Sequence, residues 1–392
     1  MTATAVAVGP ARRVPRQRLA YGGLGLLALL AALWAALVML GLDVPKPRAD
    51  FAEVHGPLMV LGFLGTLIAL ERAVAVDVPV GYMAPAAAGI GGLALILGVP
   101  LVVGQAFLTA AGVGVLGLYV VAARRQSGFH LAVMAGGAAS WVVACGLWLT
   151  GWDVGRLVPW LAGFLVLTIV GERLELSRVT RLTRTARGSF VAAVAVFAVG
   201  IAVAIGAFSP GARIAGAGLL LLTVWLARYD VARRTVRQPG LTRYMAVCLL
   251  GGYGWLAVSG VLWLRYGLAG WPAYDAMLHA LFLGFVIGMV FAHAPVIVPA
   301  VFRAVVPYRK HFYAHLILLH ASLLLRLLGG DAAGNRTAWQ LGGVLNEVAL
   351  LCFLAVTVAA VRAGRRARRT APSAIPPQWP LAAVRSPRGV PS

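Results

Sequence analysis

Long apolar stretches alternate with short polar gaps from about Ala20 to Val361. Each stretch is close to the length of about 20 residues that an α-helix needs to cross the hydrocarbon core of a bilayer. Helices are expected because backbone polar groups in lipid must be satisfied internally, and the solid apolar runs lack the alternation of a transmembrane β-barrel. The pattern therefore predicts an all-α polytopic membrane protein with about 12 transmembrane helices. The predicted spans are 19–42, 53–76, 80–100, 102–123, 128–150, 156–176, 188–208, 211–228, 243–265, 273–300, 311–328 and 338–361.

Composition and charge agree with this prediction and add an orientation. Hydrophobic residues make up 61% of the chain and charged residues 12%, too few for the polar surface of a soluble protein. With the N-terminus inside, 27 of the 34 Lys and Arg residues fall in cytoplasmic segments, as the positive-inside rule requires. We therefore expect a multi-pass protein of the cytoplasmic (inner) membrane with both termini cytoplasmic. The net charge of +22 is explained by orientation and lipid contact, so no nucleic-acid partner is expected.

Three regions follow from this reading. Residues 1–18 form a basic cytoplasmic N-terminus, residues 19–361 the transmembrane domain, and residues 362–392 a basic cytoplasmic tail. The tail is rich in Pro, Arg and Ser and is predicted to be disordered. The three cysteines all lie inside predicted helices without a CxxC motif, which excludes a covalently attached c-type haem.

A short motif recurs in the second, sixth and tenth spans. In each, Gly-Phe is followed by an ionisable residue nine positions after the Gly. The copies begin at Gly62, Gly163 and Gly284 and end at Glu71, Glu172 and His293. Spans at this spacing run in the same direction, which predicts three four-helix units around a pseudo-threefold axis. The alternative is a chance match among abundant small and apolar residues.

Ionisable side chains inside a membrane are costly and therefore mark candidate sites. His55 opens the second span and His279 lies near the start of the tenth, so both are expected at similar depth on the outer side. Two histidines on different helices can hold a haem from both faces, which makes them candidate axial ligands of haem b. Met59 and Met277 lie close by as possible additional ligands. The alternatives are interfacial anchoring for the histidines and core packing for the methionines.

A second group is expected deeper in the membrane. His293, His315, Glu71 and Glu172 could together bind copper or iron, or pass protons. At about 100° per residue, Glu71 points about 160° away from His55, whereas His293 stays within about 40° of His279. The alternative is that Glu71–Arg72 and Glu172–Arg173 are interfacial ion pairs at helix ends.

These positions resemble subunit I of the haem-copper oxidases and nitric oxide reductases. His55, in HGPLM, matches the second-span histidine of that family, and His279 matches the second member of its tenth-span His-x-His pair. Met277 stands at the first member, and the sixth span has Gly171-Glu172-Arg173 in place of the family's His-Pro-Glu. The run HALFLGFVIGM also resembles the NnrS family of haem- and copper-containing membrane proteins tied to nitric oxide stress. The resemblance implies a low-spin haem without a complete oxygen-reducing haem-copper centre.

The sequence thus favours a bis-His haem b protein acting in electron transfer or in a nitric oxide or small-gas response. If the protein is an enzyme, the resemblance implies an oxidoreductase of haem-copper type. The expected redox partner is a cupredoxin, a cytochrome or a quinone, and the expected surroundings are the lipid bilayer. The alternative is a proton-coupled secondary transporter that uses the intramembrane Glu and His residues, with Pro295 and Pro299 marking a broken helix. The oligomeric state stays open.

Overall fold

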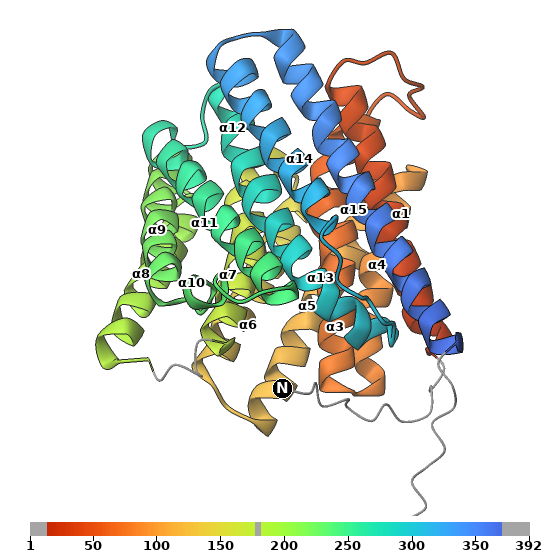
Figure 1. The fold of residues 1–392 in the computed structure, drawn as a ribbon. Coiled ribbons are helices and arrows are strands. Elements are labelled where there is room, and N and C mark those ends of the chain that lie inside the picture. Colours follow the sequence, from red (N-terminus) through yellow and green to blue (C-terminus); the bar gives the residue numbers. More distant parts are fainter. Residues whose placement is uncertain (1–13, 177–181, 371–392) are drawn as a thin grey trace, which may run out of the picture.

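A computed structural model describes residues 14–176 and 182–370 of the chain. Within these ranges, twelve helices are long and apolar enough to cross a membrane, and no β-strand occurs. The helices stand side by side as one bundle (Figure 1). The predicted all-α polytopic fold and its span count are confirmed.

The helix bounds lie within a few residues of the predicted spans for most of the chain. In order, the spans are α1 (Arg16–Met39), η1 to α3 (Phe51–Val76), η3 and α4 (Pro79–Leu97), α5 (Leu101–Arg125), α6 (Phe129–Leu149), α7 (Val154–Leu176), α8 (Arg184–Val203), α9 (Phe208–Tyr229), α11 (Leu241–Tyr266), α12 to α13 (Ala273–Phe302), α14 and η6 (Phe312–Ala332) and α15 (Arg336–Thr370). A short helix, α10 (Ala232–Thr235), precedes α11.

The last helix differs from its prediction, because α15 continues past Val361 to Thr370. The sequence predicts a disordered tail from residue 362 onward, but Ala and Arg are strong helix formers and extend the helix through residues 362–370, beyond the apolar run. Residues 1–13 and 371–392, which make up most of the two predicted terminal regions, lie outside the described part of the chain.

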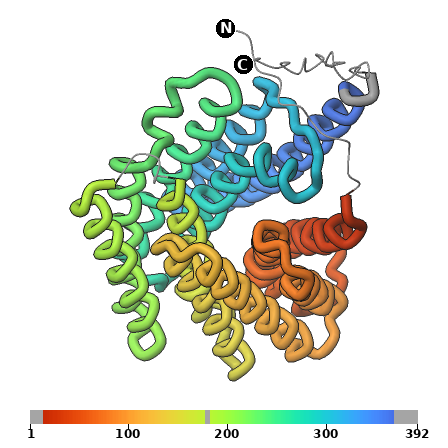
Figure 2. Tube along the Cα trace, turned by 90° about the horizontal axis from the view of Figure 1, so that it is seen from below, coloured from red at the N-terminus to blue at the C-terminus, as the bar shows by residue number. Residues whose placement is uncertain are grey.

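The chain winds once around the bundle. Seen from one end, the colours pass in order from red and orange through yellow and green to blue (Figure 2). The first and last spans meet, since α1 contacts both α13 (Gly288–Phe302) and α15.

Three spans form the centre of the bundle. The second, sixth and tenth spans are 61%, 72% and 67% buried over their most apolar windows, and no other described span exceeds 56%. They also touch: α3 (Thr66–Val76) contacts α13, and α7 contacts η5 (Ala280–Ile287). These are the spans that carry the Gly-Phe motif, and the pseudo-threefold arrangement of three four-helix units stays a prediction.

Two of the three central spans contain a π-helical segment directly after a candidate histidine. Segment η2 (Leu58–Gly65) begins three residues after His55, and η5 begins at the residue after His279. A third π-helical segment, η6 (Leu325–Ala332), ends the eleventh span. Such wide turns occur often at functional sites, and they change the direction of the side chains that follow.

Small residues bring neighbouring helices into backbone contact, as is common in membrane proteins. A Cβ added at Gly200 of α8 would lie 2.2 Å from the backbone nitrogen of Ala215 on α9. A Cβ at Gly211 of α9 would lie equally close to the backbone nitrogen of Ala204. Because backbone atoms block both positions, glycine sets the spacing between α8 and α9.

We therefore expect Gly200→Ala to push α8 and α9 apart and to destabilise the protein by about 1–3 kcal/mol, the usual cost of overpacking. Gly188→Ala is the matched control, because it lies on the same helix and has nothing within 4 Å of the added Cβ. Thermal unfolding of both variants in detergent measures the difference. Equal melting temperatures for the two variants would contradict this account of the packing.

Candidate functional site

His55 and His279 line the same cavity. Its volume is about 540 Å³, within the range of cofactor and ligand sites. Met39 and Trp271 lie among its lining residues and are exposed, so the cavity opens at the end of the bundle where the second and tenth spans begin. The apolar wall comes from several spans and includes Leu33, Val60, Leu64, Val158, Leu161, Leu278, Phe282, Leu283, Ile287 and Leu350.

Hydrogen bonds fix the orientation of both imidazole rings. His55 Nδ1 lies 2.9 Å from the carbonyl oxygen of Ala32 on α1, and His279 Nδ1 lies 2.9 Å from the carbonyl oxygen of Asp275 one turn earlier. A carbonyl can only accept, so Nδ1 carries the proton in each ring. In the described residues neither Nε2 atom has a hydrogen-bond partner, and each is therefore an unprotonated nitrogen available as a metal ligand.

The two histidines differ in their second contacts. The Asp275 carboxylate also lies 3.3 Å from His279 Nδ1, and it forms a buried two-point ion pair with Arg326, with both N···O distances at 2.8 Å. Trp339 Nε1 donates to the same carboxylate at 3.2 Å. Spans ten, eleven and twelve thus meet at Asp275, and the carboxylate of the Asp275–Arg326 ion pair is fixed beside His279.

One wall of the cavity carries polar atoms without partners. Asn346 and Glu347, adjacent on α15, are 4% and 9% exposed and line the cavity. Asn346 Oδ1 accepts from Ser322, but Asn346 Nδ2 and Glu347 Oε1 have no hydrogen-bond partner within the described chain. Since buried polar groups are normally paired, these atoms indicate a polar ligand group in the cavity.

The two candidate methionines differ in their position relative to the cavity. Met59 lines the cavity one turn after His55, whereas Met277 is fully buried and is absent from the cavity wall. Met277 therefore belongs to the core of the bundle, and Met59 keeps the position of a possible additional ligand.

The deeper candidate residues form ion pairs between helices. Arg72 of α3 contacts both Glu71 and, at 3.1 Å, Glu172 of α7, which joins the second and sixth spans. Arg173 of α7 is buried and forms a two-point ion pair with Asp230, with N···O distances of 2.7 and 2.9 Å. Of the two ion pairs expected as the alternative, Glu71–Arg72 is present, with Arg72 also reaching Glu172. Arg173 pairs with Asp230, the C-cap residue of α9, in place of Glu172.

His293 belongs to the same deep region. Its Nδ1 donates to the Met289 carbonyl at 2.7 Å, and its Nε2 faces Arg173 Nη1 at 3.4 Å. A guanidinium at the one free ring nitrogen disfavours a metal cation there, because the charges repel.

His315 lies in an aromatic setting. Its Nε2 contacts the Tyr244 hydroxyl at 2.9 Å, and its ring meets Phe291 and Phe353 edge-on. The predicted cluster of His293, His315, Glu71 and Glu172 is not assembled as a metal site, since no group of three or more potential ligands is close enough within residues 14–176 and 182–370. The copper expectation therefore gains no support.

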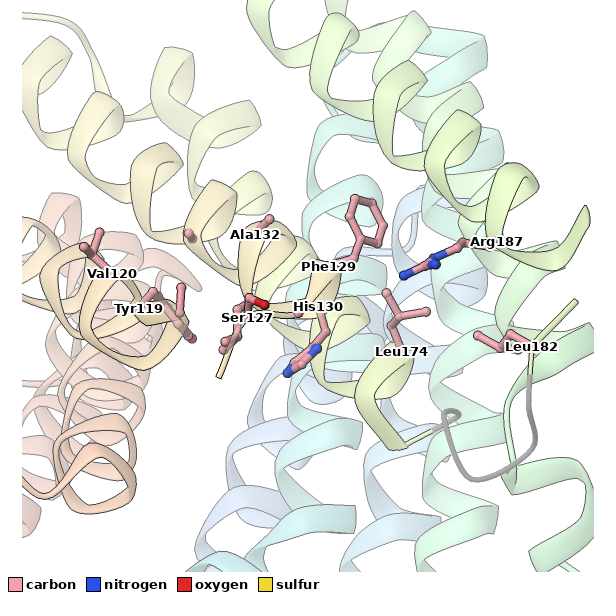
Figure 3. A pocket seen from close by; sticks show the side chains of 13 residues that line it. Tyr119, Val120, Ser127, Phe129, His130, Ala132, Leu174, Leu182 and Arg187 are labelled. Atoms are coloured by element: carbon pink, nitrogen blue, oxygen red, sulfur yellow. The ribbon is translucent and has the colours of Figure 1, made fainter. Parts of the chain in front are cut away.

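A second, more open hollow of about 790 Å³ lies between α5, α6, α7 and α8. Ser127, His130 and Arg187 line it together with apolar side chains (Figure 3). His130 lies 3.6 Å from Glu175 and contributes the only imidazole of this lining. The hollow therefore lacks the paired imidazoles of the cavity between the second and tenth spans.

Sequence reasoning missed the residues around the His279 side of the cavity. Arg326 sits in the apolar run of the eleventh span, and Asn346 and Glu347 sit in that of the twelfth. Charged or amide side chains at such depth are themselves a signal of function. The sequence around His279 also indicates a role for Asp275, because a residue four positions before a histidine lies on the same helix face and can contact it.

The fold and its cavity define a polytopic α-helical membrane protein with a histidine-lined intramembrane site. The chain belongs to the family described as Domain of unknown function (DUF8744), whose family model matches residues 18–362. Neither a search of curated proteins nor a search of solved structures found a match.

Proposed function

We propose that the protein binds haem b between His55 and His279. The observation that carries this proposal is one cavity into which two helices each present an imidazole with an unprotonated Nε2. Ligating histidines usually donate their other ring N–H to a carbonyl or carboxylate, and both do so here. A volume of about 540 Å³ with largely apolar walls suits a flat macrocycle.

Part of the polar wall also fits this ligand. Haem b carries two carboxylates, and Asn346 Nδ2 and the Arg326 guanidinium offer N–H donors on the cavity wall. The Glu347 carboxylate on the same wall pairs with such a group only when it carries a proton. Glycine at position 56 leaves the wall beside His55 without a side chain. When bound, the haem would supply one-electron chemistry or binding of a small gas, while the chain orients it and excludes water.

The role that fits this site is electron transfer or a response to nitric oxide or a similar small gas. This proposal takes the protein to lie in the cytoplasmic membrane, and the positive-inside distribution of Lys and Arg supports an orientation with both termini in the cytoplasm. The cavity then opens on the outer side, so a cupredoxin, a cytochrome or a quinone that approaches from that side is the fitting redox partner.

The optical spectrum of the detergent-purified full chain, oxidised and then dithionite-reduced, tests the proposal. We expect a Soret band and a sharp reduced α-band typical of six-coordinate haem b. Protein expressed with ample haem but lacking both bands would overturn the proposal.

The transporter alternative gains less support. Glu71 and Glu172 share Arg72 and line neither of the two cavities. The tenth span also runs as a helix through Pro295 and Pro299, without the break that a transport site would use.

A further inference from the structure

The hydrogen bonds behind the two candidate haem ligands are unequal. His55 is held through a single carbonyl, that of Ala32 on α1. His279 Nδ1 is held by the Asp275 carbonyl and lies 3.3 Å from the Asp275 carboxylate. A carboxylate held close to the N–H of an imidazole stabilises the positive charge that the ring gains when it binds a metal, and so strengthens that bond.

The Asp275 carboxylate is itself fixed. Arg326 holds both of its oxygens and Trp339 donates to one of them, and Asp275 and Arg326 are both buried. Rotation of His279 away from the cavity would break its hydrogen bond to the Asp275 carbonyl and also remove its contact with the Asp275 carboxylate. Rotation of His55 breaks only its one hydrogen bond, to the neutral carbonyl of Ala32.

The surroundings of His55 also leave space. Gly56 lines the cavity next to it, and a Cβ at Gly56 would meet only Val154 Cγ1, at an ordinary contact distance of 3.7 Å. The wall beyond Gly56 is apolar and includes Met59 and Val60, while the exposed Glu53 lines the cavity before His55. A small neutral molecule fits this wall better than an anion, because Glu53 repels a negative charge and the apolar side chains do not compensate one.

We propose that His279 is the permanent axial ligand, that Asp275 is its positioning residue, and that His55 is an exchangeable ligand that a neutral diatomic gas displaces. This rests on the proposed haem function and selects gas binding within it. In the exchange, the bond between iron and His55 Nε2 breaks and a bond between iron and the gas forms. No electron or proton is transferred, and His55 stays neutral with its proton on Nδ1.

Titration of the dithionite-reduced full chain with carbon monoxide tests whether His55 and His279 differ as ligands in this way. The variants His55→Ala and His279→Ala are compared with wild type, and the haem content of each protein is measured before carbon monoxide is added. We expect wild type to bind carbon monoxide with a Soret shift, and His55→Ala to keep its haem and bind the gas at least tenfold more tightly because no side chain competes. His279→Ala is expected to lose most of its haem.

A potentiometric titration of Asp275→Asn reports on the positioning role. Without the negative charge behind His279, the ferric form loses stabilisation, so the midpoint potential shifts upward. Trp339→Phe removes one donor from the carboxylate while leaving the Arg326 ion pair in place, and it is expected to shift the potential downward. This second variant keeps the test available if loss of the ion pair prevents Asp275→Asn from folding.

Three outcomes would overturn the inference. The first is that neither wild type nor His55→Ala binds carbon monoxide. The second is that the two histidine variants retain the same amount of haem and bind the gas with the same affinity. The third is that the midpoint potential does not change in Asp275→Asn or in Trp339→Phe. Absence of haem from wild type is a different result, since it refutes the proposed function itself.

Discussion

Replacing His279 with alanine is expected to remove the haem from the purified protein. The ligand that this variant loses is the one fixed by the buried Asp275–Arg326 pair. Loss of an outer partner of a metal ligand alone costs about 10–100-fold in affinity, so loss of the ligand itself should cost at least about 100-fold. The measurement is the Soret absorbance per chain after purification.

His130→Ala is the matched control for this variant. His130 is also a buried imidazole in a membrane span, but it lines the other hollow and lies beside Glu175. We expect its haem content to equal that of wild type. A similar loss in both variants would point to a general effect of removing a buried histidine and would contradict the assignment of His279.

The largest effect on stability is expected at Arg173. Its two-point ion pair with Asp230 is buried, and the Asp230 side chain has no exposed surface. Arg173→Leu leaves this carboxylate without its countercharge, and breaking a buried pair from one side costs about 3–5 kcal/mol. Thermal or denaturant unfolding in detergent measures the loss.

Two further variants separate charge from packing at this position. Arg173→Leu combined with Asp230→Leu is expected to recover part of the lost stability, because no charge is then left unpaired. Arg234→Leu, at an exposed position, is expected to stay within about 0.5 kcal/mol of wild type. A double variant that is less stable than Arg173→Leu would show that the pair contributes through something other than charge compensation.

The parts of the structure that depend on the local apolar pattern were predictable from the sequence. Each span contains enough apolar residues to be recognised from its own sequence, and the short loops limit how consecutive spans can be arranged. The spacing of the Gly-Phe motif also pointed to the second, sixth and tenth spans, which are the three most buried of the described helices. His55 and His279 were expected at similar depth, and they do line one cavity.

The parts that depend on how helices meet were not predictable. Glu71 and Arg72 are neighbours in the sequence, but nothing local shows that Arg72 also reaches Glu172 on another helix. The contacts of Asp275 with Arg326 and Trp339 join three spans and arise only from their packing.

The π-helical segments were missed for a different reason. Rotation angles calculated for a regular α-helix do not hold between His55 and Glu71 or between His279 and His293, because η2 and η5 lie within these intervals. The extra residue in each wide turn depends on backbone hydrogen bonding, which the hydrophobic pattern does not encode.

The ratio of haem to chain in the purified wild-type protein tests the central claim most directly. It is measured by the pyridine haemochrome assay against chain concentration, in parallel with the double variant His55→Ala/His279→Ala. One cavity with two imidazoles predicts one haem b per wild-type chain and none in the double variant. No haem in wild type, or the same ratio in both proteins, would contradict the account.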